Sequence, residues 1–206
     1  MERIEKVVYI NLEHRTDRRE ETVRELAKMF PEEKILRFEA IRNNNGAIGC
    51  TMSHISVIEM AISKKWSNIL ILEDDISWNT DFSLLTNLMN LSYDVILLSG
   101  YYANYDKLTN KVISSQTTGA YIVNSSYYQT LLTNYKEGLE KLLSTNNPRL
   151  YAIDRYWKHI QSKDSWYIIQ PNLCFQRPSY SDIEKKDVNY NKKVVGYFGF
   201  RKRINM

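Results

Sequence analysis

The sequence of 206 residues has only two cysteines, Cys50 and Cys174, and three histidines. The cysteines lie far apart, and neither belongs to a Cys-x-x-Cys motif or to a Cys/His cluster with the spacing of a zinc site. No apolar run approaches the roughly 20 residues that span a bilayer, and the first residues lack the apolar segment of a signal peptide. We therefore expect a cytoplasmic protein with two reduced thiols and no transmembrane segment.

An excess of charge of one sign is also absent. Lys and Arg outnumber Asp and Glu by 28 to 24, a net charge of +4 that favours an anionic ligand but is too small to predict a nucleic-acid partner. Without an internal repeat or a long linker, residues 1–206 are expected to form one domain. A polar tail from about residue 184 is expected to be loosely ordered. Its cationic end, Arg201-Lys202-Arg203, is expected to be solvated, with peripheral membrane contact as the alternative.

The pattern of apolar residues predicts strands that alternate with helices. Strands are expected at residues 6–12, 34–40, 69–72, 94–99, 118–123 and 166–169, and helices at 17–30, 51–65, 126–144 and 155–160. Asp17 and Glu20 have the spacing of a capping box, and Asn43-Asn44-Asn45-Gly46 predicts a turn. This alternation is typical of an α/β fold with a mainly parallel central sheet and helices on both faces.

Three consecutive carboxylates, Glu73-Asp74-Asp75, follow the aliphatic run Ile69-Leu70-Ile71-Leu72. Such a run predicts a strand buried on both faces, and ligands of open α/β sheets bind beyond the carboxyl ends of the strands. Side chains alternate along an extended chain, so Glu73 and Asp75 should project to one side and Asp74 to the other. Two carboxylates on one side suit Mg²⁺ or Mn²⁺, which commonly bind through the phosphates of a nucleotide as well. The alternative is a solvated turn.

Two further polar segments indicate an anionic ligand. Residues 49–54 enter the predicted helix at 51–65, where unpaired backbone N–H groups and the side chains of Ser53 and His54 could bind an anion. The alternative is a capped helix with a partly exposed histidine. Asn11, Arg15, Arg18 and Arg19 follow the first strand, and an arginine there can meet a diphosphate through two hydrogen bonds. The alternative, a solvated first helical turn, applies more to Arg19 than to Arg15.

Other candidates come from the aromatic residues and from the second half of the chain. Tyr101, Tyr102 and Tyr105 follow a buried strand in a predicted loop and are candidates for stacking on an acceptor sugar, whereas most other tyrosines fall on core stripes. Asp154 opens a predicted helix, a position at which an isolated acid is most often an N-cap.

Five stretches, in this order, resemble glycosyltransferase family 25, which includes bacterial lipooligosaccharide galactosyltransferases and collagen galactosyltransferases. They are Val8-Tyr9-Ile10-Asn11-Leu12 with Arg15, Asp17 and Arg18; Gly49-Cys50 with Ser53-His54; Ile71-Leu72-Glu73-Asp74-Asp75; Ala152-Ile153-Asp154; and Pro171 with Gln176 and Ser181-Asp182-Ile183. Together they span most of the chain.

The resemblance implies a GT-A fold, a UDP-sugar donor and an inverting transfer of a hexose such as galactose, glucose or N-acetylglucosamine to a glycan or glycoprotein. It makes Asp75 a direct ligand of Mn²⁺ (or Mg²⁺) and Glu73 a ligand directly or through water. The nucleotide pocket would be lined by Asn11, Leu12, Arg15, Arg18, Ser53, His54 and Asp74. Asp154 would be the base that takes the proton of the acceptor hydroxyl.

Two other functions fit the same residues. Because the acidic motif begins with Glu rather than Asp and the chain is shorter than many family members, a nucleotide-binding module without transfer is the first alternative. Paired carboxylates also serve metal-dependent hydrolases and nucleotidyltransferases, which form the second.

Overall fold

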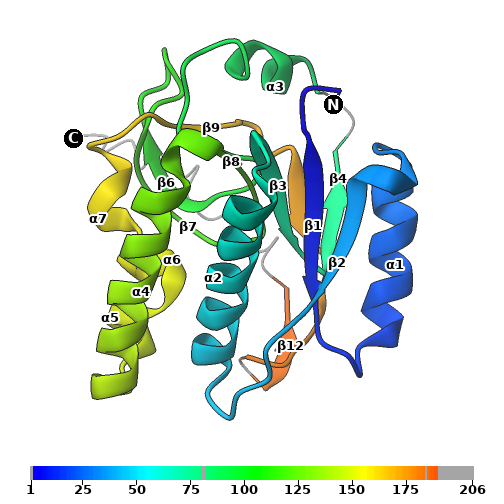
Figure 1. Ribbon diagram of the computed structural model, residues 1–206, viewed down its shortest axis with the longest axis vertical. Helices are drawn as coiled ribbons and strands as arrows, with labels where there is room; N and C mark the ends of the chain where they lie inside the picture. Colours follow the sequence, from blue (N-terminus) through cyan, green and yellow to red (C-terminus); the bar gives the residue numbers. More distant parts are fainter. Residues whose placement is uncertain (1, 80–81, 184, 190–206) are drawn as a thin grey trace, which may run out of the picture.

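The computed structural model describes residues 2–79, 82–183 and 185–189. Its central sheet has six strands: β1 (Lys6–Asn11), β2 (Ile35–Glu39), β3 (Asn68–Glu73), β5 (Val95–Leu97), β8 (Ala120–Asn124) and β9 (Trp166–Ile168). The spatial order is β2-β1-β3-β8-β5-β9 (Figure 1). β1 is parallel to β2 and β3, and β5 is parallel to β9, whereas β8 is antiparallel to both of its neighbours. The predicted mainly parallel sheet is confirmed, with one reversed strand.

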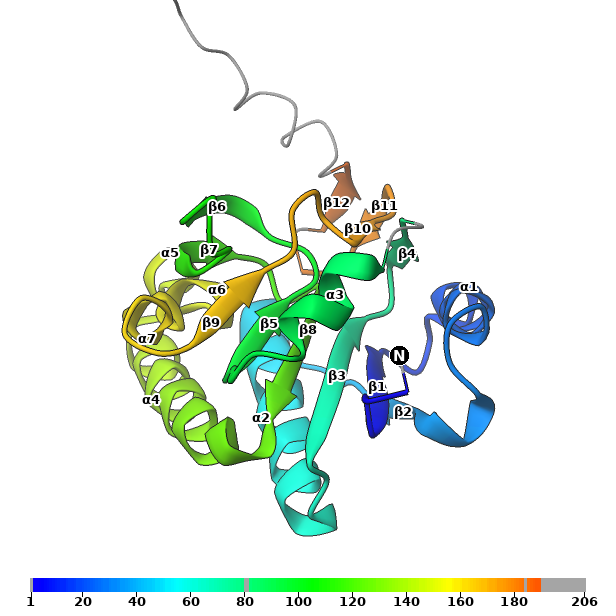
Figure 2. The same cartoon turned by 90° about the horizontal axis from the view of Figure 1, so that it is seen from above.

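Helices cover both faces of this sheet, as expected (Figures 1 and 2). Helices α2 (Gly46–Lys64) and α4 (Tyr128–Thr145) pack on one face, and α1 (Thr16–Ala27) and α3 (Ser83–Leu88) lie on the other. The alternation of β3 produces the two cores. Ile69 and Ile71 pack with residues of α2 and α4, and Leu70 and Leu72 pack with residues of α1 and α3. Shorter segments complete the helical structure: η1 (Glu32–Lys34), η2 (Ser125–Tyr127), α5 (Pro148–Tyr151), α6 (Ile153–Tyr156) and α7 (Lys158–Gln161).

Three small antiparallel pairs lie outside the central sheet. They are β4 (Ile76–Trp78) with β10 (Cys174–Gln176), β6 (Tyr101–Tyr105) with β7 (Val112–Gln116), and β11 (Ser179–Ser181) with β12 (Lys186–Val188). The loop predicted at Tyr101–Tyr105 is therefore wrong, because this segment pairs as a strand. The β4–β10 pairing sets Gln176 opposite Ile76, directly after the acidic residues that follow β3.

The helices begin differently from the sequence prediction. α2 begins at Gly46 rather than Thr51, because the Asn45 side chain accepts a hydrogen bond from Ala47 N at 3.1 Å and caps the helix. The predicted capping box of α1 is absent, since its N-cap residue is Arg15 and makes no side-chain cap. The helix expected at 155–160 is divided into α6 and α7.

The end of the chain is described only in part. Lys186–Val188, within the tail predicted from about residue 184, forms β12 and pairs with β11. Residues 184 and 190–206, including Arg201-Lys202-Arg203, lie outside the described residues. Across the described ranges, no helix has the length and apolar character needed to cross a membrane.

Candidate functional site

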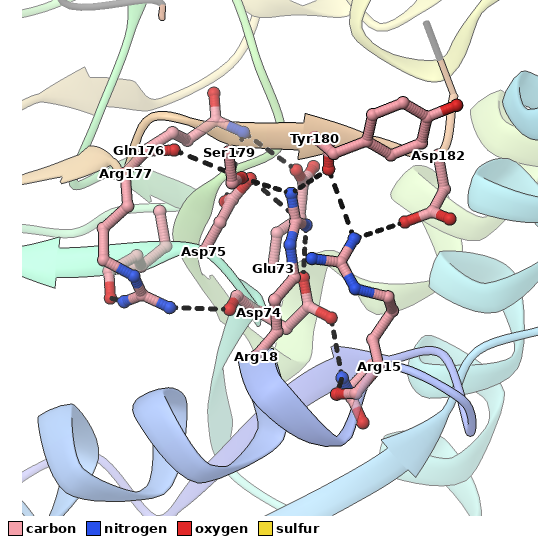
Figure 3. Close-up of polar contacts among 12 residues, drawn as sticks. Arg15, Arg18, Glu73, Asp74, Asp75, Gln176, Arg177, Ser179, Tyr180 and Asp182 are labelled. Carbon is pink, nitrogen blue, oxygen red and sulfur yellow. Dashed lines mark hydrogen bonds and ion pairs between the residues drawn. The ribbon is translucent and has the colours of Figure 1, made fainter. Parts of the chain in front are cut away.

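The three acids at and after the end of β3, which form the acidic turn, have different polar partners (Figure 3). Gln176 Nε2 lies 3.1 Å from Glu73 Oε2 and 3.3 Å from Asp75 Oδ1, so these two carboxylates face one side. Asp74 accepts hydrogen bonds from Asn11 Nδ2 and Arg18 Nη1, both at 2.7 Å. Glu73 and Asp75 thus meet at Gln176, whereas Asp74 and Asp75 meet at the Arg18 guanidinium.

Burial changes the ionisation of this pair. Burial raises the pKa of Glu73 above its ordinary value, and the negative charge of Asp75 raises it further. Burial also raises the pKa of Asp75, against the lowering effect of the Arg18 guanidinium, whose Nη1 lies 3.4 Å away. A divalent cation would favour the ionised form of both groups, and their oxygen atoms are ligands that Mn²⁺ and Mg²⁺ prefer.

Arg18 joins the acidic turn to the hairpin of β11 and β12. Its guanidinium donates from Nη1 to Asp74 and from Nη2 to Ser179 Oγ at 2.5 Å and to Tyr180 O at 2.8 Å. Only 11% of the side chain is exposed, and its buried Nε has no partner among the described residues. Arg18 thus offers an unused donor at the edge of the acidic turn.

Arg15 and Asn11 bind side chains in or around the acidic turn. Arg15 Nη1 pairs with Asp182 Oδ2 at 2.6 Å, and its Nη2 pairs with Asp17 Oδ2 at 2.8 Å. Asn11 is buried and donates to Asp74, while its Oδ1 accepts a hydrogen bond from Arg37 Nε at 3.0 Å. Neither residue is among those that line the cavity over the acidic turn, and their part in nucleotide binding stays a prediction.

A cavity of about 550 Å³ opens over the acidic turn. The predicted residues Leu12, Arg18, Ser53, His54, Glu73, Asp74 and Asp75 all line it. The hairpin of β11 and β12 covers one part of this cavity, and the segment from Ala40 to Asn44 borders another. The sequence thus identified most of the residues that this structure brings together there.

The predicted anion site at the start of α2 is wrong. Because α2 begins at Gly46, residues 49–54 lie inside the helix, and Gly49 N already donates to Asn45 O at 3.2 Å. Ser53 Oγ donates to Gly49 O at 2.7 Å and accepts from Ile41 N at 2.8 Å. The Ser53 hydroxyl therefore fixes the cavity wall and is not a free donor.

His54 is fully buried, not partly exposed. Its Nδ1 lies 2.7 Å from the Tyr121 hydroxyl, which also accepts a hydrogen bond from Tyr135 Oη at 3.1 Å. Burial lowers the pKa of His54 to about 3, so the ring is neutral at physiological pH. One ring nitrogen of His54, Cys50 Sγ and a carboxylate oxygen of Glu73 lie within 4.8 Å of one another, a group that could hold a metal ion.

A second cavity, of about 490 Å³, contains Asp154. Tyr101 and Tyr102 line it, whereas Tyr105 packs against the core beneath α2 and α4. Asp154 Oδ2 accepts a hydrogen bond from Thr117 N at 3.2 Å, and burial raises the pKa of Asp154 above its ordinary value. Ala152, not Asp154, is the N-cap residue of α6, so the acid is placed in the first turn and projects into this cavity.

The two cavities adjoin. Both are lined by Cys50, Glu73, Gln176 and Ile183. Glu73 and Gln176 thus lie where the space over the acidic turn meets the space beside Asp154. This arrangement fits two substrates that react across a shared boundary.

Sequence reasoning missed the roles of Thr118, Gln176 and Arg177. Thr118 Oγ1 donates to Glu73 Oε1 at 2.6 Å, and Arg177 binds Asp74 O through Nη2 at 3.0 Å and Asp75 O through its backbone N at 2.7 Å. Gln176 belongs to the stretch near Pro171 that carries the family resemblance, but the resemblance assigns no role to this residue. Thr118 and Arg177 carried no such signal.

Comparisons with known proteins agree with this architecture. A family model described as glycosyltransferase family 25 (LPS biosynthesis protein) matches residues 42–202. A Homo sapiens protein named inactive glycosyltransferase 25 family member 3 is 25% identical over 186 residues, which cover 74% of this chain and 31% of that protein. The chain thus spans under a third of the length of this relative.

Two solved structures resemble this chain to different degrees. A glycosyltransferase involved in the glycosylation of the major capsid of PBCV-1 matches with a TM-score of 0.53 and 11% identity, covering 81% of each chain. The glycosyltransferase GlyE of Streptococcus pneumoniae TIGR4 matches with a TM-score of 0.47 and 11% identity, covering 81% of this chain and 45% of that chain. The first of these matches supports the expected GT-A-like fold. Since the family model covers more than half of the sequence, the chain belongs to glycosyltransferase family 25.

Proposed function

We propose that this protein transfers a hexose from a UDP-sugar to a hydroxyl group of a glycan or glycoprotein, with inversion at the anomeric carbon. Family membership and fold support a glycosyltransferase. The observation that carries the proposal is the meeting of two cavities at Glu73 and Gln176, one over the acidic turn and one beside Asp154. The donor and the acceptor of a transferase would then each occupy one cavity, and they would meet where the two cavities adjoin.

The first cavity is proposed to bind the UDP part of the donor. Glu73 and Asp75 face the same side and provide hard oxygen ligands, so their chemistry fits Mn²⁺ or Mg²⁺. A metal bound there supplies Lewis-acid stabilisation of the charge on the leaving diphosphate. Arg18 adds a fixed positive charge, with a buried Nε that has no partner within the described part of the chain.

The second cavity is proposed to bind the acceptor. In an inverting transfer, the acceptor oxygen bonds to the anomeric carbon while the bond to the diphosphate breaks, and the hydroxyl proton must go to a base. Asp154 is the base in this proposal, and its raised pKa makes it a better proton acceptor than an ordinary aspartate. Thr117 N holds the carboxylate through Oδ2. Tyr101 and Tyr102 supply aromatic surface for an acceptor sugar.

The test is calorimetry with UDP and Mn²⁺, followed by a screen of UDP-sugars for consumption. Wild-type protein should bind UDP more tightly when Mn²⁺ is present, and Asp75→Ala should lose roughly 10–100-fold of that affinity because a ligand of the metal is gone. Asp106→Ala is the control, since Asp106 is an exposed acid in the turn between β6 and β7. Unchanged affinity in Asp75→Ala would remove the metal site from the proposal.

A nucleotide-binding module without transfer is the second candidate. It is favoured by the human relative, which is named inactive. It also fits the bonds of Glu73, because Thr118 and Gln176 already occupy both carboxylate oxygens. Consumption of a UDP-sugar in the presence of an acceptor would exclude this candidate, and tight UDP binding without consumption would favour it.

A further inference from the structure

Cys50, His54 and Glu73 form a second cluster of potential metal ligands, beside the pair Glu73 and Asp75. Cys50 and His54 are four residues apart on α2 and so lie on one face of the helix, and Glu73 ends β3. Their ligand atoms, a thiol sulfur, a ring nitrogen and a carboxylate oxygen, lie within 4.8 Å of one another. Sequence spacing gave no sign of this cluster because its third member comes from another element.

The ring of His54 provides an independent sign of a ligand. Nδ1 of His54 lies 2.7 Å from the Tyr121 hydroxyl, so this ring nitrogen has a hydrogen-bond partner whichever of the two groups donates. The other ring nitrogen is Nε2. This buried Nε2 has no hydrogen-bond partner among the residues that the structure describes, and the side chain is 0% exposed. Buried polar groups are seldom left unpaired, and such an exception calls for a physical explanation.

We propose that Cys50, His54 and Glu73 bind Zn²⁺, through Sγ, Nε2 and a carboxylate oxygen, and leave a fourth position open to the cavities. A mixed set of sulfur, nitrogen and oxygen ligands suits Zn²⁺, whereas Mn²⁺ favours oxygen. Cys50 and Glu73 line both cavities and His54 lines the first, so an ion has a path to the cluster. Side-chain rotation must draw the three ligand atoms together, to the spacing of about 3.5 Å that Zn–S and Zn–N bond lengths imply.

The hydrogen bonds around His54 can accommodate this change. On binding, the Cys50 thiol and, where it is protonated, the Glu73 carboxyl release their protons to solvent, and the single proton of the neutral His54 ring is held on Nδ1, since Nε2 binds the metal. Nδ1 then donates to the Tyr121 oxygen, the Tyr121 hydroxyl donates to Tyr135 Oη, and the Tyr135 hydroxyl hydrogen turns away from Tyr121. The distances of 2.7 Å and 3.1 Å allow a hydrogen bond in either direction. Tyr121 would thus orient the metal-bound ring from its far side, as a partner of a ligating histidine commonly does.

Zinc binding has a consequence that rests on the proposed function, although the zinc site itself does not. Glu73 belongs both to the zinc cluster and to the proposed Mn²⁺ pair with Asp75. A Glu73 carboxylate held by Zn²⁺ is no longer available to Mn²⁺, so Zn²⁺ should weaken Mn²⁺-dependent UDP binding. The proposed enzyme would then be inhibited by Zn²⁺ at the boundary between its two cavities.

Titration of the full chain with Co²⁺ under reducing conditions tests the site, because a Co²⁺–thiolate bond gives a charge-transfer absorption that oxygen ligands alone do not. The wild type should show this absorption at one Co²⁺ per chain, and Zn²⁺ should abolish it by displacement. Cys50→Ser should lose the absorption and roughly tenfold or more of the Zn²⁺ affinity. Cys174→Ser is the matched control, since Cys174 is the other cysteine and packs in the opposite core.

The outcomes separate this inference from the proposed function. Absence of the absorption in the wild type, or its persistence in Cys50→Ser, would overturn the zinc site. Far-UV circular dichroism of each variant establishes that it is folded, and His54→Gln provides a second ligand deletion if Cys50→Ser is unfolded. Calorimetry with UDP and Mn²⁺ in the absence of Zn²⁺ tests the donor site independently, in the wild type and in Asp75→Ala.

Discussion

At the scale of single residues, Asp154 allows the proposed chemistry to be tested separately from the proposed donor binding. It lines the cavity beside the acidic turn and is not among the residues that line the proposed donor cavity. If it is the base, Asp154→Asn should lower turnover by about 10²–10⁴-fold, because an amide cannot take the acceptor proton. The affinity for UDP with Mn²⁺ should stay near the wild-type value, since no donor contact is removed.

The measurement for Asp154 pairs steady-state turnover with calorimetry on the same preparation. The Asn side chain retains an oxygen that can accept the Thr117 N–H, so the local fold should persist. An equal loss of turnover and of UDP affinity would assign Asp154 to binding or to structure. Normal turnover would remove it from the reaction altogether.

The sequence predicts features of the site that depend on neighbouring residues in the chain. It does not predict contacts between residues that are far apart in the chain. The position of the three acids at the end of a buried strand follows from the local aliphatic run of β3. The contacts of Glu73 with Thr118 and Gln176 depend instead on how β3 meets β8 and β10. No local pattern of residues encodes such pairings. The residues that contact Glu73 could therefore be identified only from the structure.

At the scale of elements, the hairpin of β11 and β12 covers part of the proposed donor cavity and is bound by two arginines at the start of α1. Arg15 pairs with Asp182 at 2.6 Å, and Arg18 bonds Ser179 and Tyr180. Asp182→Ala removes the acid that anchors Arg15, so UDP affinity should fall by roughly 3–10-fold, the effect of a contact worth about 1 kcal/mol. Backbone amides of residues 179–188 should also exchange faster with solvent.

Asp187→Ala provides a matched control on the same hairpin. Asp187 is exposed on β12, so its removal deletes an acid of the same type without the Arg15 contact. Calorimetry and hydrogen exchange should give wild-type values for this control. Similar effects in both variants would mean that net charge, not the Arg15–Asp182 pair, governs the hairpin.

The boundaries of the elements show why patterns of apolar residues were informative only in part. All six strands of the central sheet were predicted because their apolar runs are continuous or nearly so. The strands of the β4–β10 and β11–β12 pairs have three residues each, too few to establish a period. Asn45 and Gly46 were interpreted as a turn, since the same residue types that form turns also cap helices.

At the scale of the whole molecule, the buried acids are expected to lower stability as the pH rises. Burial raises the pKa of Glu73 and of Asp75 in the folded protein. A carboxyl group with a raised pKa in the folded state contributes stability that is fully present below its unfolded pKa. That contribution is lost as the pH rises through the folded value. For Glu73 the loss begins near the ordinary pKa of 4.5.

Glu73→Gln should therefore stabilise the fold while it weakens the donor site. The amide carries no charge to bury, so the free energy of unfolding should exceed that of the wild type by roughly 0.5–2 kcal/mol at about pH 8. The difference should shrink as the pH falls below the ordinary pKa of 4.5, where Glu73 becomes protonated in both states. Urea unfolding across this range measures it, with Glu140→Gln, an exposed position on α4, as the control.

Calorimetry of the same Glu73→Gln variant completes the argument, because Mn²⁺-dependent UDP binding should weaken as stability rises. A gain in stability together with a loss of affinity would mean that the buried charge of Glu73 destabilises the folded protein but is needed for ligand binding. If stability is unchanged at every pH, the burial of Glu73 carries no penalty. The carboxylate would then already be neutralised within the folded protein, with no need of a metal ion.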